Sequence, residues 1–472
     1  RRMKVNCMED IVKVLKGTGF SSISAQEIEM LENYLYCIDE RGMIVKRLSP
    51  SNSHYYSTLQ NAKDEHKLVE LTEGQYLLPG FIDLHIHAPQ WAQSGTALDI
   101  PLHQWLNTYT FPLESKFEDT LFAKKVYSHL VDTLLANGTT TGLYFATVHE
   151  ESSYQLAKIC AEKGQRGLVG KVVMDDPDQN PDYYRDNDTQ TALEETERFI
   201  NRVKALHEET IQGVYPVITP RFVPSCTDSA LDGLGKLAEA YDVHVTSHCS
   251  ESDWEHGYVK ERFGKNDTQV LNEFGLLREK SVMAHCNFLS EADACTFKEK
   301  GSAIAHCPIS NAYFANSVIP IKHFHDLGVE VGLGTDLSGG YDPSIYSAIR
   351  QTVISSRMLE DGVDTEKAPE DRGGRSNSRV TAKEAFYFAT AGGGESLSLP
   401  IGRLAENYAF DAQIIDTTIS QASMPIFDEN EPLEDIFQKL LYLTKRENII
   451  SVWVQGKKIA NKKESYTYNG EY

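Results

Sequence analysis

The stretch Gly80–Ala88 reads GFIDLHIHA, an apolar run that ends in two histidines and is followed by Pro89 and Gln90. Side chains alternate between the two faces of a strand, so His85 and His87 would point to the same side. Two imidazoles on one face, at the end of a strand, can bind one metal ion through neutral nitrogens. Two histidines on a solvent-exposed strand face are the alternative, because short pairs of this kind recur by chance. Whether this pair binds a metal ion depends on which further ligands the rest of the chain supplies.

Seven more apolar runs follow, and most end on a polar or charged residue. They are Gly138–Thr147, Arg166–Asp175, Val214–Phe222, Val243–Ser250, Ser281–Cys286, Ser302–Cys307 and Val329–Asp336. Segments with apolar residues every three or four positions lie between most of them and predict helices. These are Leu121–Asn137, Ser152–Lys163, Ala192–His207, Ser229–Tyr241 and Glu291–Lys300. The alternation predicts an α/β fold, a closed (β/α)8 TIM-like barrel. An open doubly wound sheet is the alternative, but no glycine-rich phosphate-binding turn follows the first run.

The two ends of the chain lie outside this alternation. Residues 1–76 combine short strand-like pieces with a polar insert, Ser49–Lys67, for which we expect an exposed loop. Residues 396–472 return to short strands. We expect the two ends to form a small β-sandwich domain beside a barrel of residues 77–395. Within the barrel, the charged and glycine-containing residues 360–378 predict a flexible surface loop.

Composition and charge narrow the class of protein. The chain has 472 residues, of which 41% are hydrophobic, enough for a sizeable core and more than one domain. A net charge of −22 argues against nucleic acid or an anionic membrane as partner. Eight scattered cysteines without a CxxC pair favour a reduced protein over a disulfide scaffold or zinc finger. No apolar run has the length of a signal peptide or membrane span, so we expect a soluble, cytosolic protein.

In a parallel barrel the chemistry lies at the carboxyl ends of the strands. Five of the fifteen histidines fall at such ends, which random placement would rarely achieve: His85, His87, His248, His285 and His306. The eighth run ends on Asp336. Three imidazoles and one carboxylate suit zinc, with water completing the shell. We therefore expect a metal site at His85, His87, His248 and Asp336. A bound metal lowers the pKa of water and makes hydroxide available near neutral pH.

Three further strand-end residues are candidates for other roles. Glu251, three residues after His248, can act as a proton shuttle, although alone it would suggest a solvated carboxylate at a helix start. His285 could hold or polarise the group under attack, with a buried structural histidine as the alternative. For His306 a structural role is at least as well supported as direct contact.

Three cysteines each follow a strand-end histidine, which suggests a mixed Cys/His metal site: Cys249, Cys286 and Cys307. Strand alternation argues against such a site. If each histidine faces the barrel interior, the next residue faces the surrounding helices. We therefore expect these cysteines to be small buried packing residues.

The motifs PGFIDLHIH, HCSE, AHC, AHCPISN and GLGTD occur in this order and together resemble the amidohydrolase superfamily, in its nucleobase-deaminase branch. The resemblance runs from Leu78 to about Thr390, and the flanking β segments match the small composite domain of that family. Within the branch the likeness is greatest to enzymes that deaminate guanine. It rests on HIHAPQ, WLNTYTFPLE, GTTTGLYFAT, GQRGLVGKVVMD and TPRF.

The resemblance implies a role for each candidate residue. It places one zinc ion per chain on His85, His87, His248 and Asp336. Catalytic roles fall on Glu251, His285 and Asp336, and contacts to the purine on Gln90, Trp91, Arg221, Phe222 and His248. These side chains suit a purine: Arg221 offers a rigid fork of donors, Gln90 both donates and accepts, and Phe222 gives an apolar face. An ion pair to an acidic neighbour is the alternative for Arg221, and a place in the core is the alternative for Phe222.

The resemblance also implies an activity, hydrolytic deamination of guanine to xanthine and ammonia. The partners would be guanine and water, without nucleic acid or membrane, and a homodimer is common among the relatives. The fourth run ends without the carbamylated lysine of binuclear members, which favours a single metal ion. The chain departs from the family at Asn407, where a glycine is usual; asparagine can adopt the same left-handed backbone. One alternative is a deaminase or chlorohydrolase for another amino-substituted heterocycle, and a more remote one is a catalytically silent structural homologue.

Overall fold

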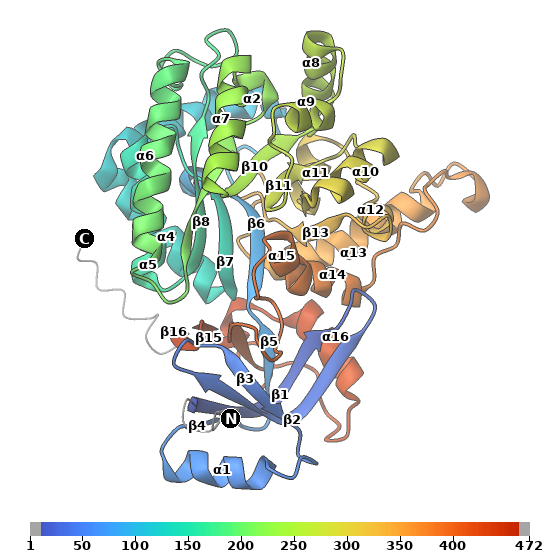
Figure 1. The fold of residues 1–472 in the computed structure, drawn as a ribbon. Helices are drawn as coiled ribbons and strands as arrows, with labels where there is room; N and C mark the ends of the chain where they lie inside the picture. Colours follow the sequence, from blue (N-terminus) through green and yellow to red (C-terminus); the bar gives the residue numbers. More distant parts are fainter. Residues whose placement is uncertain (1–10, 462–472) are drawn as a thin grey trace.

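The eight predicted strand runs form eight strands, each hydrogen-bonded in parallel to the next along the chain. They are β6 (Phe81–His87), β7 (Thr139–Phe145), β8 (Arg166–Val173), β9 (Val214–Pro220), β10 (His244–Cys249), β11 (Ser281–His285), β12 (Ala303–His306) and β13 (Glu330–Leu333). The computed structural model describes residues 11–461 (Figure 1). A parallel bridge between Ile86 and Leu337 joins the first strand to the segment after the last, which makes the barrel nearly closed. The predicted TIM-like barrel is confirmed.

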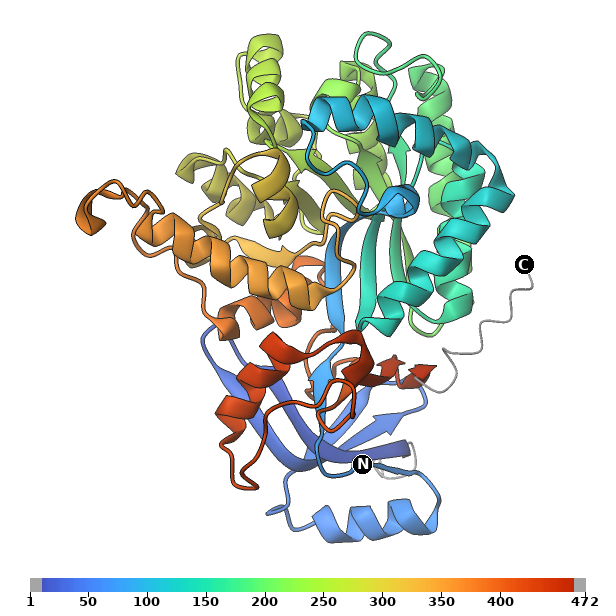
Figure 2. The ribbon, with the colours of Figure 1, turned by 180° about the vertical axis from the view of Figure 1, so that it is seen from behind.

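Helices surround the barrel (Figures 1 and 2). The five predicted helices all form, with ends within three residues of the prediction: α4 (Thr120–Ala136), α5 (Glu150–Lys163), α6 (Thr189–His207), α7 (Asp228–Tyr241) and α10 (Glu291–Lys300). Further helices are α2 (Leu102–Trp105), α3 (Phe111–Ser115), α8 (Asp253–Phe263), α9 (Asp267–Glu273), α11 (Pro308–Phe314), α12 (Ile321–Asp326), α13 (Ile345–Asp361), α14 (Ala382–Ala389) and α15 (Ala391–Ser396). A π-helical turn, η2 (Leu106–Thr110), connects α2 to α3.

The barrel interior is filled by apolar side chains from six strands. One buried cluster draws on β6, β7, β8, β9, β11 and β12, and such side chains can meet only inside the barrel: Ile82, Leu84, Leu143, Leu168, Val217, Val282, Ala284, Ala303 and Ala305. Strand β6 has a register shift between Asp83 and Ile86. Because of this irregularity, β6 contributes Leu84 to the interior cluster and still turns the two histidines that follow toward the same centre.

The two ends of the chain form a mixed sheet below the barrel in Figure 1. Its strands are β1 (Ile11–Ser22), β2 (Ile28–Asp39), β3 (Ile44–Leu48), β4 (Leu68–Glu70), β5 (Gln75–Pro79), β14 (Ala412–Asp416), β15 (Ile449–Val454) and β16 (Lys457–Asn461). Helix α16 (Leu433–Leu443) lies beside them. The prediction of a small β domain from both ends is confirmed, and its described strands are joined in one sheet. β5 runs past the predicted boundary at residue 76 and leads through Gly80 directly into β6.

The polar insert Ser49–Lys67 is not simply a loop, because it contains helix α1 (Tyr55–Asp64). Only Tyr55 and Ala62 of this helix are buried, packed in a cluster with residues of β1 and β2. The Tyr55 hydroxyl donates to the backbone oxygen of Asn33 at 2.6 Å. Two buried side chains in ten residues leave too sparse an apolar pattern to predict a helix.

The charged residues 360–378 follow α13 and project from the side of the barrel (Figure 2). They contain one short turn of 3-10 helix, η5 (Pro369–Asp371), and residues 363–371 are exposed. The segment therefore lies on the surface, as predicted from its charge.

Candidate metal centre and substrate pocket

The carboxyl ends of the strands bring the four predicted metal ligands together. His85 Nε2 lies 3.1 Å and His87 Nε2 3.5 Å from Asp336 Oδ1. The Nε2 atoms of His87 and His248 are 3.0 Å apart. Their side chains come from β6, from β10 and from the turn after β13, and all are buried.

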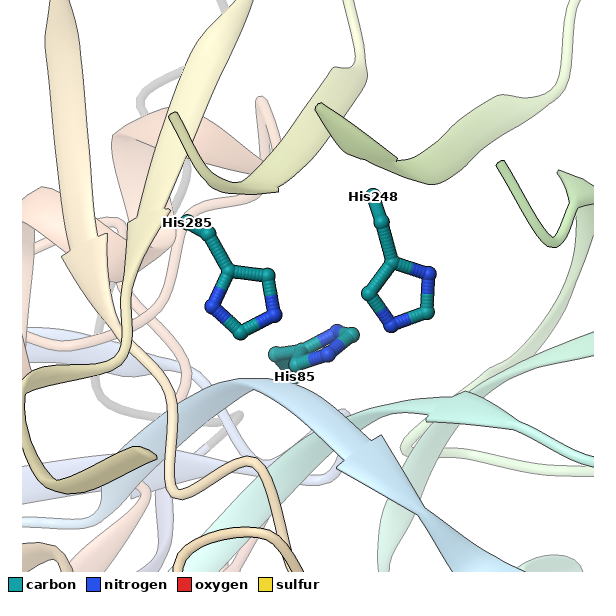
Figure 3. A group of neighbouring side chains, drawn as sticks. All are labelled: His85, His248 and His285. Atoms are coloured by element: carbon teal, nitrogen blue, oxygen red, sulfur yellow. The ribbon is translucent and has the colours of Figure 1, made fainter. Parts of the chain in front are cut away.

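His285, at the end of β11, and Glu251, after β10, complete the cluster. His285 Nε2 lies 3.5 Å from Glu251 Oε1 and 3.8 Å from Asp336 Oδ2. Figure 3 shows the rings of His85, His248 and His285 directed toward one another. Three groups each have donor atoms close enough to share one ion: His85, His248 and His285; His85, His87 and Asp336; and Glu251, His285 and Asp336.

The local backbone directs these side chains inward. His285 has a φ of 70° and Asp336 a φ of 50°, values that non-glycine residues seldom adopt and that occur often at functional sites. Buried Asp83 fixes the end of the eighth strand, because it accepts hydrogen bonds from Thr335 N at 3.0 Å and Thr335 Oγ1 at 2.6 Å. Burial raises the pKa of Asp83 to about 7.

Hydrogen bonds to the far ring nitrogens orient two of the histidines. His248 Nδ1 donates to the backbone oxygen of Arg221 at 2.5 Å, and His285 Nδ1 donates to Asn311 Oδ1 at 2.8 Å. Each bond leaves Nε2 facing the centre of the cluster, which is how metal-binding histidines are usually held. Burial, reinforced by neighbouring histidines, holds the pKa of His87 and His248 well below the ordinary value. They are therefore neutral, as metal ligation requires.

The donor set fits a metal ion. His85 is fully buried, its Nδ1 makes no hydrogen bond to a described residue, and its Nε2 lies 3.1 Å from the carboxylate of Asp336. A buried polar atom without a partner is costly and calls for an explanation. The close approach of His87 Nε2 to His248 Nε2 is also explained if both nitrogens face one cation. Neutral imidazoles together with the Asp336 carboxylate are suitable ligands for zinc.

Glu251 and His285 differ electrostatically from the neutral histidines. Burial raises the pKa of Glu251, partly opposed by His285. Burial would lower the pKa of His285, but the charges of Glu251 and Asp336 outweigh it and raise that pKa. The pair can therefore hold a proton between an imidazole and a carboxyl group.

An inner cavity lies directly over this cluster. Its walls include three metal-ligand candidates, Glu251 and three further predicted substrate contacts, with apolar side chains around them: His87, Gln90, Leu102, Trp105, Leu106, Phe111, Arg221, Phe222, His248, Glu251, Phe314, Asp336 and Gly339. A second, outer cavity of about 1290 Å³ shares several of these walls, among them Phe222 and Phe314. The inner cavity therefore has mostly apolar walls, with polar side chains where it meets the metal-ligand cluster.

Arg221 forms the ion pair that sequence analysis left open as its alternative role. Its partner is Glu114, fully buried on α3, with Arg221 Nη1 2.7 Å from Glu114 Oε2. Gln90 Nε2 donates to Glu114 Oε1 at 3.1 Å. Glu114 is not among the predicted site residues, although it is the last residue of the stretch WLNTYTFPLE. A glutamate on a helix of only five residues has no local sequence pattern that predicts its burial.

Trp91, the remaining predicted contact, packs against α4. Its indole N–H donates to His129 Nδ1 at 2.9 Å, and the two rings are stacked. The tryptophan in the wall of the inner cavity is Trp105. Trp91 directly follows Gln90, and a turn of 3-10 helix over Ala88–Gln93 sends the two side chains in different directions.

The neighbours of the strand-end histidines are buried, as predicted. Cys249 and Cys286 pack in the large apolar cluster that includes the surrounding helices. Cys307 differs: a Cβ built on Gly334 would lie 3.0 Å from Cys307 Sγ and 2.8 Å from His85 Cβ, so this cysteine lies beside the metal-ligand cluster rather than against the helices. His306 is buried, and burial lowers its pKa to about 3, so it is neutral.

Comparison with known proteins gives consistent matches over most of the chain. A model of the amidohydrolase family matches residues 76–459. A guanine deaminase of Dictyostelium discoideum is 38% identical over 97% of this chain and 99% of that protein, and one of Mus musculus is 37% identical over 94% and 96%. A crystal structure of guanine deaminase from C. acetobutylicum, with guanine bound in the active site, has a TM-score of 0.83 and 31% identity, covering 95% of this chain and 100% of that one. Within residues 11–461, no helix has the length and apolar character needed to cross a membrane.

Proposed function

This chain belongs to the amidohydrolase family, and on that premise we propose that it hydrolyses guanine to xanthine and ammonia. The observation that carries the proposal is the convergence of the metal-ligand cluster, Glu251 and the polar walls Gln90 and Arg221 on one cavity. The similarity to guanine deaminases over nearly the whole chain supports the same activity.

We propose that His85, His87, His248 and Asp336 hold one zinc ion. All four side chains are buried; the donor atoms of His85, His87 and Asp336 are close enough to share one ion, and His248 Nε2 lies 3.0 Å from His87 Nε2, an arrangement that suits zinc. When bound, zinc acts as a Lewis acid that lowers the pKa of water toward neutrality. A single ion is supported at the fourth strand, where β9 ends without a lysine. Lys171 of β8 is instead paired with Asp186 at 3.1 Å.

Proton transfer is assigned to Glu251. Its Oε1 faces the cluster, and its raised pKa lets the carboxyl group hold a proton during turnover. Glu251 takes a proton from the attacking water and delivers one to the ring nitrogen beside the carbon that bears the amine. It then helps ammonia leave, so that water and guanine give xanthine and ammonia. His285, whose pKa is raised by the charges of Glu251 and Asp336, stabilises the charge that develops near the attacking oxygen.

Recognition of the base is assigned to the walls of the inner cavity. Arg221 donates hydrogen bonds, and the guanine carbonyl accepts them. Gln90 presents a donor and an acceptor, and Phe222 offers an apolar face to the flat ring. We do not assign Trp91 to the pocket, because its indole is bound to His129 on α4.

The test is ammonia release from a panel of bases by the zinc-loaded protein. We expect rapid release from guanine and little from adenine, cytosine or 8-oxoguanine. An amino-substituted triazine and an amino-substituted pterin are included because the outer cavity has room for a larger ring system or substituent. Faster release from either of these than from guanine would favour the heterocycle-deaminase alternative, and no release from any compound would overturn the proposal.

We further propose that the protein is a cytosolic homodimer, which is common among the relatives that the chain resembles. Light scattering of the purified protein measures the oligomeric state. A monomer at micromolar concentration would contradict this part of the proposal without affecting the assigned chemistry.

A further inference from the structure

One buried carboxylate, Glu114, contacts two side chains that line the inner cavity and has no part in the proposed reaction. Glu114 is 0% exposed, and its charge is balanced by Arg221, which is 5% exposed. The contact is two-pronged: Arg221 Nη1 donates to Oε2 at 2.7 Å and Arg221 Nη2 donates to Oε1 at 3.1 Å. Paired forks of this kind fix both distance and plane.

The same carboxylate also holds the amide of Gln90. Gln90 Nε2 donates to Glu114 Oε1 at 3.1 Å, so a single oxygen receives hydrogen bonds from Gln90 and from Arg221. Gln90 follows β6 and Arg221 follows β9, the first and fourth strands of the barrel. Glu114 therefore connects two side chains from well-separated parts of the barrel mouth.

The contact decides which way round the Gln90 amide lies. A carboxylate only accepts hydrogen bonds, so the NH2 end of the amide must face Glu114. The oxygen end then faces the backbone N–H of Ser338, at 3.4 Å. Without Glu114 the amide could turn over and exchange its donor and acceptor, which would change the hydrogen-bonding pattern presented to a ligand.

The local structure keeps Glu114 in place. It lies on α3, directly after the π-helical turn Leu106–Thr110, and such turns occur often at functional sites. Phe111, on the same helix, lines the inner cavity and lies 5.1 Å from the Arg221 guanidinium carbon, measured to the ring centre. Thr110 accepts a hydrogen bond from Gln93 Nε2 at 2.8 Å, which ties the segment to the turn after β6.

We propose that Glu114 is a positioning residue for base recognition: it fixes Gln90 and Arg221 in one geometry and sets the donor and acceptor pattern that selects guanine. The assignment rests on the proposed function. It adds a specificity determinant that contacts the substrate-binding side chains rather than the reacting atoms.

The main test is steady-state kinetics of the zinc-loaded Glu114→Asp variant with guanine. Aspartate keeps the charge that Arg221 needs but is one methylene shorter, so it cannot reach both partners. We expect KM to rise about tenfold, the size expected for loss of one charge-assisted hydrogen bond, while kcat changes less than about threefold. Glu118→Gln is the matched control, because Glu118 lies four residues on and is exposed. Its kinetic constants should equal those of the wild type.

A double-mutant cycle separates positioning from general stabilisation. The single change Gln90→Ala should raise KM. Adding Gln90→Ala to Glu114→Asp should raise KM little further, because both changes remove the contact between Gln90 and Glu114. Discrimination between guanine and adenine should fall in all three variants. The assignment would be overturned if the increase in KM of the double variant equalled the product of the two single increases, or if KM were unchanged in Glu114→Asp.

Two further outcomes separate this inference from the proposed function. A loss of zinc or of thermal stability that lowers kcat and leaves KM unchanged would show that Glu114 is merely structural, and would overturn the positioning role alone. A wild-type protein that releases no ammonia from guanine would overturn the proposed function and this assignment together.

Discussion

At the scale of single residues, the sharpest expectation concerns Glu251. The change Glu251→Gln keeps the size of the side chain but removes the group that accepts and returns the proton. We expect kcat for guanine to fall at least about a hundredfold, the size of a general acid–base contribution. Zinc content, measured by atomic emission, should stay at the wild-type level, because Glu251 lies outside the proposed ligand set.

Glu261→Gln provides the control for that experiment. Glu261 lies on the same helix–loop segment, on α8, and is exposed. It should have wild-type kinetics. Near-normal turnover in Glu251→Gln would contradict the proton-transfer role, even if the metal and fold are intact.

The site residues that could be predicted from the sequence are those whose residue type and position in a motif are enough to indicate their role. His85, His87 and His248 end apolar runs, and Asp336 ends GLGTD. Asn407 is a similar case: it has a φ of 68°, the left-handed conformation expected for a residue that replaces glycine. Glu114 could not be found in this way. Its burial depends on Arg221, which lies 107 positions further along the chain.

At the scale of elements, β10 contains a second histidine with a different role. His244, its first residue, is buried and its Nε2 donates to the backbone oxygen of Leu397 at 2.9 Å. Burial, with a smaller contribution from Lys280, lowers the pKa of His244 to about 4, although the hydrogen bond to Leu397 and the charge of Asp242 oppose this shift. The unfolded chain, with a histidine pKa near 6.5, therefore binds a proton more readily than the native protein.

This shift predicts how stability depends on pH. The native-state pKa lies below the unfolded value, so the stabilisation is present above pH ~6.5 and is lost as the pH falls toward 4. From pH 7 to pH 5, the wild type should lose about 2 kcal/mol more stability than His244→Gln, whose amide can keep the hydrogen bond without titrating. Urea unfolding at both pH values measures the difference. An equal loss in both proteins would contradict a neutral, buried His244.

Elements with a strong repeating pattern could be predicted, and those held by sparse contacts could not. The five predicted helices bury a regular apolar face, as α6 does with Phe199, Ile200 and Val203. Helix α1 buries only Tyr55 and Ala62, and it is stabilised by contacts with β1 and β2 rather than by its own pattern. A pattern restricted to one segment cannot reveal such contacts.

At the scale of the whole molecule, the two parts are joined covalently and by a buried ion pair. β5 of the terminal sheet continues through Gly80 into β6 of the barrel. Arg166, at the start of β8, pairs with Asp411, just before β14, and both are about 2% exposed. Arg166 Nη2 also donates to Gln455 Oε1 at 2.6 Å. The short strand-like runs at both ends of the chain predict a small β domain, but they do not predict this junction, because it depends on residues hundreds of positions apart.

The junction leads to a prediction about stability rather than chemistry. Removing one partner of a buried ion pair leaves the other charge without compensation, which costs about 3–5 kcal/mol. Asp411→Ala should therefore lower the thermal midpoint by several degrees, while kcat of the folded protein at 25 °C stays near the wild-type value, because the junction lies at the amino end of the barrel strands. Glu151→Ala is the control: it removes an exposed pair with Arg202, worth at most about 1 kcal/mol. Equal midpoints for the two variants would show that the buried pair does not hold the terminal sheet to the barrel.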